Sequence, residues 1–581
     1  MNAPPVTEHQ AISATVPASS PEKRSHRWIV DLIAILFVAV IGFKFTWHAA
    51  LAGDINLSDE CWYALTGYDL PKDGLPPACF SPLYSIWYWT FSDLQPDPVV
   101  LQIWNWRFLV TSLGILVYLI TRRAGASPVV SLLASCWLIA SNLMGVWPYP
   151  TYFVTMMAGV CCLVAMYFRS AWYQVAFIAC TLGIASFVRP EMLVAQIAVV
   201  GVLFLSMLAA YFLGTLTLHR AAAVMAVSLV PAMLLALAFG NPMAGGRSEI
   251  AFGQHYALNK SEAGKVQINP WVNWESIVSE DFGSACSPSQ ALVRNPKAMM
   301  WHINRNLSNA WDAFRRLANL NLHAATIKAI AIYSVLGLLV ISLLAFCRRD
   351  FVSQCADSAR KLFVPFCTVA AIAVPVTIAC TLIYPRDHYL FPIVFFLIIL
   401  VTILIARMSW LDLKIASQPL VLTVVGLVMV VAVPNVAHRW SIKPLLVWES
   451  DLKPAFHNRQ SIAEIKAAPV KGPVRIIEGA LLYRMAFPKA DVKMLSMWET
   501  KKAKSFAEYV RQHDVNVVIA TRDLEVCTWI ANDPTYTKLR DDPASDFIQW
   551  KPGTGDLQLL IRRDAFSSES TKPIAISNST R

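Results

Sequence analysis

The sequence predicts a polytopic α-helical membrane protein that ends in a small α/β domain, and three observations carry this prediction. Of its 581 residues, 56% are hydrophobic and only 15% are charged, whereas soluble proteins carry about 25% charged residues. Several apolar runs approach or exceed ~18 residues, the length that crosses a bilayer core. After residue 438, charge rises and the apolar runs shorten. The chain therefore divides into a membrane region and a C-terminal domain.

The membrane region is predicted to hold eleven transmembrane helices. Residues 1–27 are rich in Pro, Ser, Thr and Ala and then basic, which is typical of a disordered cytoplasmic tail. The first apolar run has no small-residue cleavage site, so we expect it to be retained as a span. The predicted spans are 28–50, 100–121, 128–145, 150–168, 172–188, 192–213, 222–240, 326–346, 362–383, 389–407 and 417–437.

The short loops indicate how the chain crosses the membrane. Loops rich in Lys and Arg, such as TRRAGAS, LHRAA and CRRDFVSQCADSARK, all fall on the side of the N-terminal tail. Because basic loops stay in the cytoplasm, we expect the outer loops 51–99 and 241–325 and the C-terminal region to lie outside. The net charge of +11 fits this bias and contact with anionic lipid headgroups, and nothing indicates nucleic-acid binding. The compact C-terminal domain favours a multi-pass protein of a bacterial inner membrane.

Residues 28–437 are thus predicted to be the catalytic membrane region, and residues 438–581 a periplasmic α/β domain. In the latter, the segments PVRIIEGA, VNVVIA and LQLLIRR are rich in β-branched residues and are typical of strands. The segment FAEYVRQH has the apolar spacing of an amphipathic helix.

Two carboxylates that follow the first span, Asp59 and Glu60, are the candidate catalytic residues. Asp59 has the position of a helix N-cap before an amphipathic segment that includes Tyr63, and a second aromatic segment covers residues 76–91. We expect both segments to be helices that lie in the membrane interface and frame a groove. Asp54 competes as the base, Glu60 could instead be a cap or a solvated loop residue, and Tyr63 an interfacial anchor.

Further ionisable residues lie at the outer ends of later spans and in the loop 241–325. Such groups are costly at membrane depth and are often functional, although anchoring at helix ends or a structural ion pair would explain them too. Arginine suits phosphate because its guanidinium is a planar fork of donors. Carboxylates, arginines and an apolar groove together suit a lipid that carries a phosphate and a polar headgroup. Besides Tyr63, the candidate binding residues are Arg189, Glu191, Arg247, His255, Arg386, His388 and Tyr389.

The cysteines and acidic residues give no metal signature. No C-x-x-C or Cys/His set has zinc spacing, and the outer loops contain no D-x-D. We therefore predict no metal ligand, while a divalent cation remains open as a cofactor. Cys61 and Cys79 share the first outer loop, which leaves a disulfide between them open.

The order of these motifs resembles the GT-C superfamily of membrane glycosyltransferases, which includes protein O-mannosyltransferases and the aminoarabinose transferases of lipid A. Asp59-Glu60-Cys61-Trp62-Tyr63 is similar to the family's Asp-Glu-x-x-Tyr, and Ser81-Pro82-Leu83-Tyr84-Ser85-Ile86-Trp87 to its Lys-Pro-Pro-Leu-Tyr-Tyr-Trp. Further similarities are Arg107 at the start of a span, the turn Arg189-Pro190-Glu191, and the pair Arg386 and Tyr389. Ser81 replaces the family's Lys, so another cation must hold the donor phosphate, the candidates being Arg189, Arg247, Arg386 and His388.

The resemblance implies an inverting glycosyltransferase that uses a polyprenyl-phosphate-linked sugar. It would transfer a hexose or pentose to a lipid, glycan or protein acceptor on the outer face of the membrane. Asp59 would be the general base, and Arg386 with His388 would neutralise the leaving phosphate. A flippase or transporter of lipid-linked sugars and an O-antigen ligase or polymerase are the alternatives.

Overall fold

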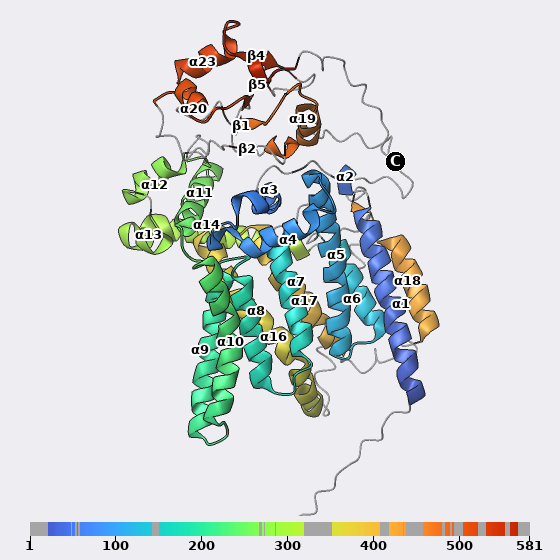
Figure 1. The fold of residues 1–581 in the computed structure, drawn as a ribbon. Helices are drawn as coiled ribbons and strands as arrows, with labels where there is room; N and C mark the ends of the chain where they lie inside the picture. Colours follow the sequence, from blue (N-terminus) through green and yellow to red (C-terminus); the bar gives the residue numbers. More distant parts are fainter. Residues whose placement is uncertain are drawn as a thin grey trace, which may run out of the picture.

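The computed structural model shows a bundle of long helices with a small mixed sheet above one end of it (Figure 1). The residues that it describes are 21–47, 49–52, 55, 59–141, 144, 150–265, 270–271, 273–284, 286–318, 351–406, 418–433, 435–436, 457–478, 483–487, 491–492, 504–520, 524, 530, 532–551 and 558–567. Asp54 and the predicted span 326–346 lie outside the described residues.

The bundle contains six described helices that are long and apolar enough to cross a membrane, by length and composition. They are α1 (Pro21–Thr46), α5 (Pro98–Arg123), α9 (Met192–Phe212), α10 (Leu218–Phe239), α16 (Phe351–Leu382) and α17 (Asp387–Ala406). Four shorter apolar helices coincide with further predicted spans, namely α6 (Pro128–Ala140), α7 (Pro150–Ala165), α8 (Ala171–Ala185) and α18 (Pro419–Ala432). Helices of this length and composition are those of a multi-pass membrane protein.

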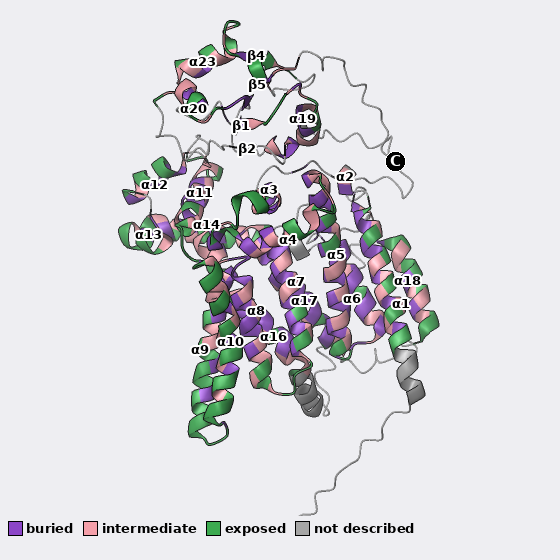
Figure 2. Cartoon of the chain, viewed as in Figure 1, coloured by how far each residue is buried: buried purple, intermediate pink, exposed green. Residues whose placement is uncertain are grey.

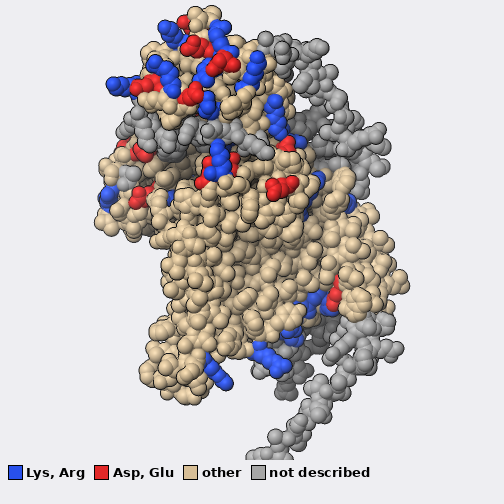
Figure 3. All heavy atoms as spheres, in the orientation of Figure 1, with Lys and Arg blue, Asp and Glu red and all other residues tan. Residues whose placement is uncertain are grey.

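The outer surface of the bundle suits a lipid environment. On the helices α9 and α10, much of the apolar surface is exposed, with Phe212 77% and Leu237 83% exposed (Figure 2). Figure 3 shows an almost uncharged band around this face of the bundle, with the charged sheet domain above it and a group of Lys and Arg side chains at its lower end. A band of this kind is the surface that a bilayer core would cover.

Two helices of the first outer loop lie on the upper end of the bundle, where the sequence predicts interfacial helices. They are α3 (Asp59–Asp73) and α4 (Pro82–Ser92). The two helices pack tightly at Gly67, because a Cβ atom there would lie 2.6 Å from the Cβ of Tyr88 and 2.9 Å from the backbone oxygen of Ser85. Glycine thus allows α3 and α4 to approach closely.

The long loop 241–325 is largely helical in its described part. It forms α11 (Arg247–Glu262), α12 (Trp274–Phe282), α13 (Pro288–Arg294) and α14 (Pro296–Ala318). Phe252, Tyr256 and Trp274 belong to a small core that holds these helices together. This core fixes α11, the helix that carries two of the predicted binding residues.

The C-terminal part is a five-stranded sheet with the strand order β2-β1-β3-β5-β4. Strand β1 pairs in parallel with β2 and β3, and β5 pairs antiparallel with β3 and β4. The strands are β1 (Arg475–Glu478), β2 (Asp491–Val492), β3 (Val517–Ala520), β4 (Phe547–Trp550) and β5 (Gln558–Arg562). The three segments expected as strands contain β1, β3 and β5, and the expected helix is α20 (Phe506–Gln512).

The two faces of this sheet bury different partners. Alternate side chains of a strand point to opposite faces, so Val518 packs with α20 and α23 (Pro534–Asp541), whereas Val517 and Ile519 face α19 (His457–Lys466). The core on the α19 side also contains residues of the first outer loop, namely Ile55, Cys61 and Leu65. The sheet domain and α3 therefore share one hydrophobic core.

Candidate active site

Helix α3 directs its side chains to three different surroundings. Residues one turn apart share a helix face, and Cys61, Leu65 and Asp69 face the sheet domain. Glu60 faces α4 and α5, whereas Asp59 shares a face with Tyr63. The apolar residues that make this segment amphipathic are thus covered by other parts of the protein on two sides of the helix.

Glu60 is the most unusual of these residues, because its carboxyl group is buried with only 2% of the residue exposed. The hydroxyl of Tyr84 donates a hydrogen bond of 2.7 Å to its Oε1, and the hydroxyl of Tyr88 donates to the same oxygen. Asn105 of α5 donates through Nδ2 to both tyrosine oxygens, at 2.8 and 2.9 Å. The expectation of a solvated loop residue or a cap is therefore wrong for Glu60.

This environment favours the neutral form of the carboxyl group. Burial raises the pKa of Glu60 to about 8, against the opposing effect of the hydrogen bonds from Tyr88 and Tyr84, and the nearby charge of Asp59 raises it further. A buried carboxyl that lacks a cationic partner takes up a proton for this reason. At neutral pH, the carboxyl group of Glu60 is therefore mainly in its neutral form.

Asp59 is exposed and is the first residue of α3. Residues 56–58 lie outside the described part of the chain, so the N-cap role of Asp59 stays a prediction. At this place the carboxylate lies at the positive end of the helix dipole, which stabilises a negative charge. Asp59 is thus an accessible carboxylate on a buried, rigidly packed helix.

Tyr63 and Arg247 connect this helix to the long loop. Tyr63 is 3% exposed, and its hydroxyl oxygen accepts a hydrogen bond of 3.0 Å from Nη2 of Arg247. Nη1 of Arg247 donates to the backbone oxygen of Cys79 at 2.6 Å. The side chain of Tyr63 is therefore buried within the protein and is not exposed as an interfacial anchor. Arg247 connects the start of α11 to both predicted helical segments of the first outer loop.

The turn between α8 and α9 supplies a second guanidinium group. Nε of Arg189 donates to Oε1 of Glu191 at 2.6 Å, and the guanidinium lies 4.9 Å from the ring centroid of Tyr389. The same turn binds the start of α4, since Oγ of Ser81 donates to the backbone oxygen of Val188 at 2.6 Å. Ser81 thus brings α4 next to Arg189, at the position where the resembled family has its Lys.

The third guanidinium group, that of Arg386, is held by neutral His255. Nε of Arg386 donates to Nε2 of His255 at 3.0 Å, while Nδ1 of the ring lies 2.6 Å from the backbone oxygen of Ala251. Burial, reinforced by the charge of Arg386, lowers the pKa of His255 to about 3. Trp271 packs at 5.4 Å from the Arg386 guanidinium. The neutral imidazole therefore orients Arg386 without neutralising it.

All the predicted binding residues lie in one continuous cluster. His388 is buried beside Tyr389, with ring centroids 4.5 Å apart, and interacts electrostatically with both Arg189 and Arg386. Within the described part of the chain, Arg189 forms an ion pair with Glu191, whereas Arg247 and Arg386 form none. The cluster has an excess of positive charge, and Arg247 connects it to Tyr63 of α3.

The structure adds three residues that the sequence reasoning did not select, Tyr84, Tyr88 and Asn105. Tyr84 and Tyr88 are spaced by four residues on α4 and so share one helix face. That spacing was available in the sequence, but a buried acid as their partner was not. Cys61 and Cys79 are both buried and form no disulfide, so the pairing that the sequence left open is absent between these two residues.

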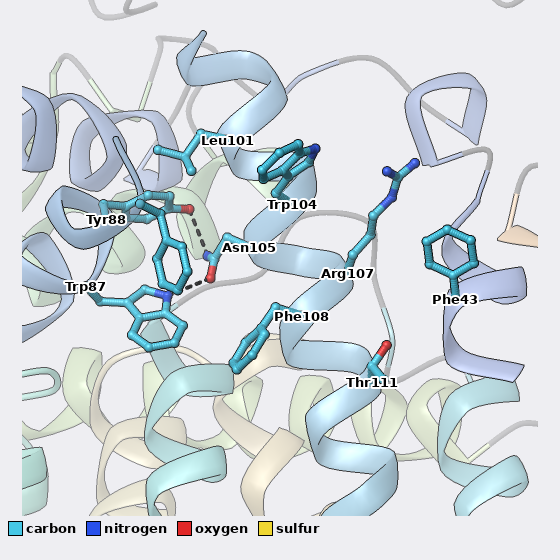
Figure 4. A pocket seen from close by; sticks show the side chains of 10 residues that line it. Phe43, Trp87, Tyr88, Leu101, Trp104, Asn105, Arg107, Phe108 and Thr111 are labelled. Carbon is cyan, nitrogen blue, oxygen red and sulfur yellow. Dashed lines mark hydrogen bonds between the residues drawn. The ribbon is translucent and has the colours of Figure 1, made fainter. Parts of the chain in front are cut away.

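An aromatic groove borders the hydrogen-bond network around Glu60 (Figure 4). It encloses about 500 Å³ between α1, α4 and α5. Tyr88 and Asn105, which hold Glu60, form part of its wall, together with Trp87. Arg107 lies at the end toward α1, where Nη2 donates to the backbone oxygen of Trp47 at 2.7 Å. The remaining lining residues are Phe43, Phe91, Leu101, Trp104, Phe108 and Thr111.

A smaller pocket of about 240 Å³ lies beside Arg386, and Asp312 and Asp387 also line it. Among the described residues, no group of three or more His, Cys, Asp or Glu side chains has the arrangement of a metal site. In the described part of the chain, the groups suited to bind an anion are therefore arginine side chains, and a preformed metal centre is not among them.

Fold and site together define a multi-pass membrane protein with a charged, buried cluster at one end of its bundle. No protein-family model matches this chain, and no curated protein does. The crystal structure of ArnT from Cupriavidus metallidurans bound to undecaprenyl phosphate is similar to it, with 12% sequence identity and a TM-score of 0.38, over 94% of this chain and 99% of that chain. A likeness of this degree leaves the function to be argued from the site.

Proposed function

We propose that this protein is a glycosyltransferase that moves a sugar from a polyprenyl-phosphate donor to an acceptor at the outer face of the membrane. The observation that carries the proposal is the cluster of Arg189, Arg247 and Arg386, which Arg247 joins to Tyr63 of α3, the helix that also presents Asp59. Such a site combines an accessible carboxylate with cations suited to a phosphate. The side of the membrane follows from the basic loops, and the sequence resemblance to GT-C enzymes supports the reaction class.

Asp59 is the proposed general base. It is exposed at the start of a packed helix, where an acceptor can reach it, whereas Glu60 beside it is buried and its pKa is raised. The acceptor hydroxyl or amine attacks the anomeric carbon while Asp59 takes its proton. The bond from that carbon to the phosphate oxygen breaks, and the lipid phosphate leaves with the electron pair.

Arg386 and Arg247 are the proposed partners of the leaving phosphate. Arg386 commits Nε to His255, which leaves both Nη groups of its fork for an anion. Arg189 is already paired with Glu191, so its main role is to add positive potential and to hold Tyr389. Donors that are preorganised in this way stabilise charge that develops on the leaving group. Glu191, His388 and Tyr389 belong to the same cluster and are proposed to contact the donor headgroup.

The aromatic groove supports a substrate with an apolar chain. Its wall shares Tyr88 and Asn105 with the network that holds Glu60, so a chain bound there would lie next to the catalytic helix. We propose that it receives the hydrocarbon part of a lipid substrate.

Substitution of the base tests this function. A strain that lacks the protein is complemented with wild type, Asp59→Asn or Asp73→Asn at matched protein levels, and mass spectrometry compares envelope lipids, glycans and glycoproteins. Loss of the base is expected to lower the modification by about 100-fold or more. Asp73, at the far end of the same helix, is the matched control and is expected to restore it fully.

The outcome also decides against the alternatives. If Asp59→Asn restores the sugar as well as wild type does, Asp59 is not the base and the proposed mechanism fails. In that case, movement of a radiolabelled lipid-linked sugar across proteoliposomes would support a flippase. The molecule that loses its sugar on deletion identifies the acceptor.

A further inference from the structure

The sheet domain contacts several segments of the membrane region, and one of them is the helix that carries the proposed base. Cys61 and Leu65 of α3 are 0% and 1% exposed because they are part of the core formed by one face of the sheet. Gln102 of α5 donates to Sγ of Cys61 at 3.3 Å and to Sδ of Met485 at 3.7 Å. The domain thus touches both α3 and α5.

A buried cation lies at the centre of this contact. Arg484 belongs to the short helix η5 (Tyr483–Ala486), which follows β1, and its side chain is 11% exposed. Nη1 lies 3.6 Å from Oδ2 of Asp69, which is itself 16% exposed, and the guanidinium lies 5.4 Å from the ring centroid of Trp62. Both contacts are with α3.

The position of Arg484 is set by the end of strand β1. The backbone N–H of Arg484 donates to Oε2 of Glu478 at 3.0 Å, and Glu478 is 1% exposed as the last residue of the strand. Crevices at the carboxyl ends of parallel strands are where α/β sheets usually hold a ligand. In this protein, the short helix η5 lies at the end of β1, and its Arg484 reaches from there to α3.

We infer that the C-terminal domain positions α3, and with it Asp59 and Glu60, through the buried guanidinium of Arg484. This inference rests on the proposed function for its consequence in catalysis, but the contact itself does not. Removing one partner of a largely buried ion pair is destabilising. Loss of Arg484 therefore loosens α3 at Asp69, and the carboxylate of Asp59 at the start of the same helix loses its fixed position.

Hydrogen exchange on the full-length chain in lipid nanodiscs tests the contact directly. Arg484→Gln is expected to speed exchange of the α3 amides by about tenfold or more, while the amides of β3 and β5 keep their wild-type protection. Arg484→Lys keeps the charge but not the planar stack on Trp62, so it should recover part of the protection. Arg475→Gln is the matched control, because Arg475 pairs with Asp514 in the same domain and contacts no residue of α3.

A double-mutant cycle isolates the pair. Asp69→Asn is expected to loosen α3 by a similar factor, and the double variant with Arg484→Gln should exchange no faster than either single one. In the transferase assay, Arg484→Gln should lower kcat by about tenfold with little change in KM, because the donor-binding arginines are intact.

Two results would overturn the inference. One is wild-type exchange of α3 in Arg484→Gln with the sheet still protected. The other is a double variant in which the free-energy effects of Arg484→Gln and Asp69→Asn on exchange of the α3 amides equal the sum of the two single effects. If the wild-type protein transfers no sugar, the proposed function fails, yet the exchange data still decide whether Arg484 holds α3.

Discussion

Glu60 shows how far the surroundings of a single residue can change its chemistry. In the sequence it stands beside Asp59 as an equivalent acid, but in the structure one carboxyl is exposed and the other is buried among Tyr84, Tyr88 and Asn105. A charge is unfavourable in such surroundings unless a cation compensates it. The buried carboxyl of Glu60 is therefore held in its neutral form, whereas that of Asp59 stays accessible.

A pH series should reveal this buried acid. With a pKa near 8 in the folded chain and 4.5 as its ordinary value, Glu60 holds its proton more tightly when folded. Its contribution to stability is therefore complete below about pH 4.5 and is lost as the pH rises through 8, by up to about 5 kcal/mol. Glu60→Gln cannot ionise, so its apparent melting temperature should fall less than that of wild type between pH 5 and 8.

The control for this experiment is Glu275→Gln, which changes an exposed acid of α12. That variant is expected to follow the wild-type pH profile. An unchanged slope in Glu60→Gln would contradict a buried acid with a raised pKa.

At the scale of elements, helix α3 owes its rigidity to packing on two sides. The sequence predicts an amphipathic helix here, and a helix lying in the membrane interface explains the pattern as well as a buried one does. In the structure, α4 covers one side and the sheet domain another. The close approach of α3 and α4 depends on Gly67, whose Cβ position is occupied by atoms of Tyr88 and Ser85.

Gly67→Ala should therefore separate the two helices. The added methyl group would meet Tyr88 at 2.6 Å, and overpacking of this kind costs about 1–3 kcal/mol. We expect a lower melting temperature and faster hydrogen exchange in α3 and α4. Gly201→Ala in α9 is the matched control, since nothing lies within 4 Å of its Cβ position, and it should be neutral or slightly stabilising. Equal melting temperatures for the two variants would argue against the tight contact.

At the scale of the whole molecule, charge separates the two ends of the bundle. Figure 3 shows Lys and Arg at the lower end, where α5 ends with Arg122 and Arg123. Near this end, Nε of Arg122 pairs with Oδ1 of Asp31 in α1 at 2.7 Å. By the positive-inside bias, this end should face the cytoplasm and the sheet domain should lie outside.

Cysteine labelling tests this orientation. Ala544→Cys in the sheet domain should react with a membrane-impermeant maleimide in intact spheroplasts of a bacterial host. Thr217→Cys, which precedes α10 at the lower end, should react only after permeabilisation. Both positions are exposed. The unsubstituted chain gives the background from native cysteines, and the reverse labelling pattern would show that the predicted orientation is wrong.

The sequence by itself determined the membrane class, the positions of the described apolar helices and the strands β1, β3 and β5. These features follow from local hydrophobicity and its period, which neighbouring elements do not alter. It also selected the cluster residues, because ionisable groups are rare in an apolar chain and are conspicuous there.

Only the tertiary structure decided whether each of those residues is buried and which groups it contacts. Whether Glu60 is solvated or buried depends on α4 and α5, and the pairing of Cys61 depends on the sheet domain that covers it. Arg484 lies more than 400 residues from Asp69 in the sequence, so no local pattern could connect them. Burial and pairing are set by contacts between distant segments, and these exist only once the chain has folded.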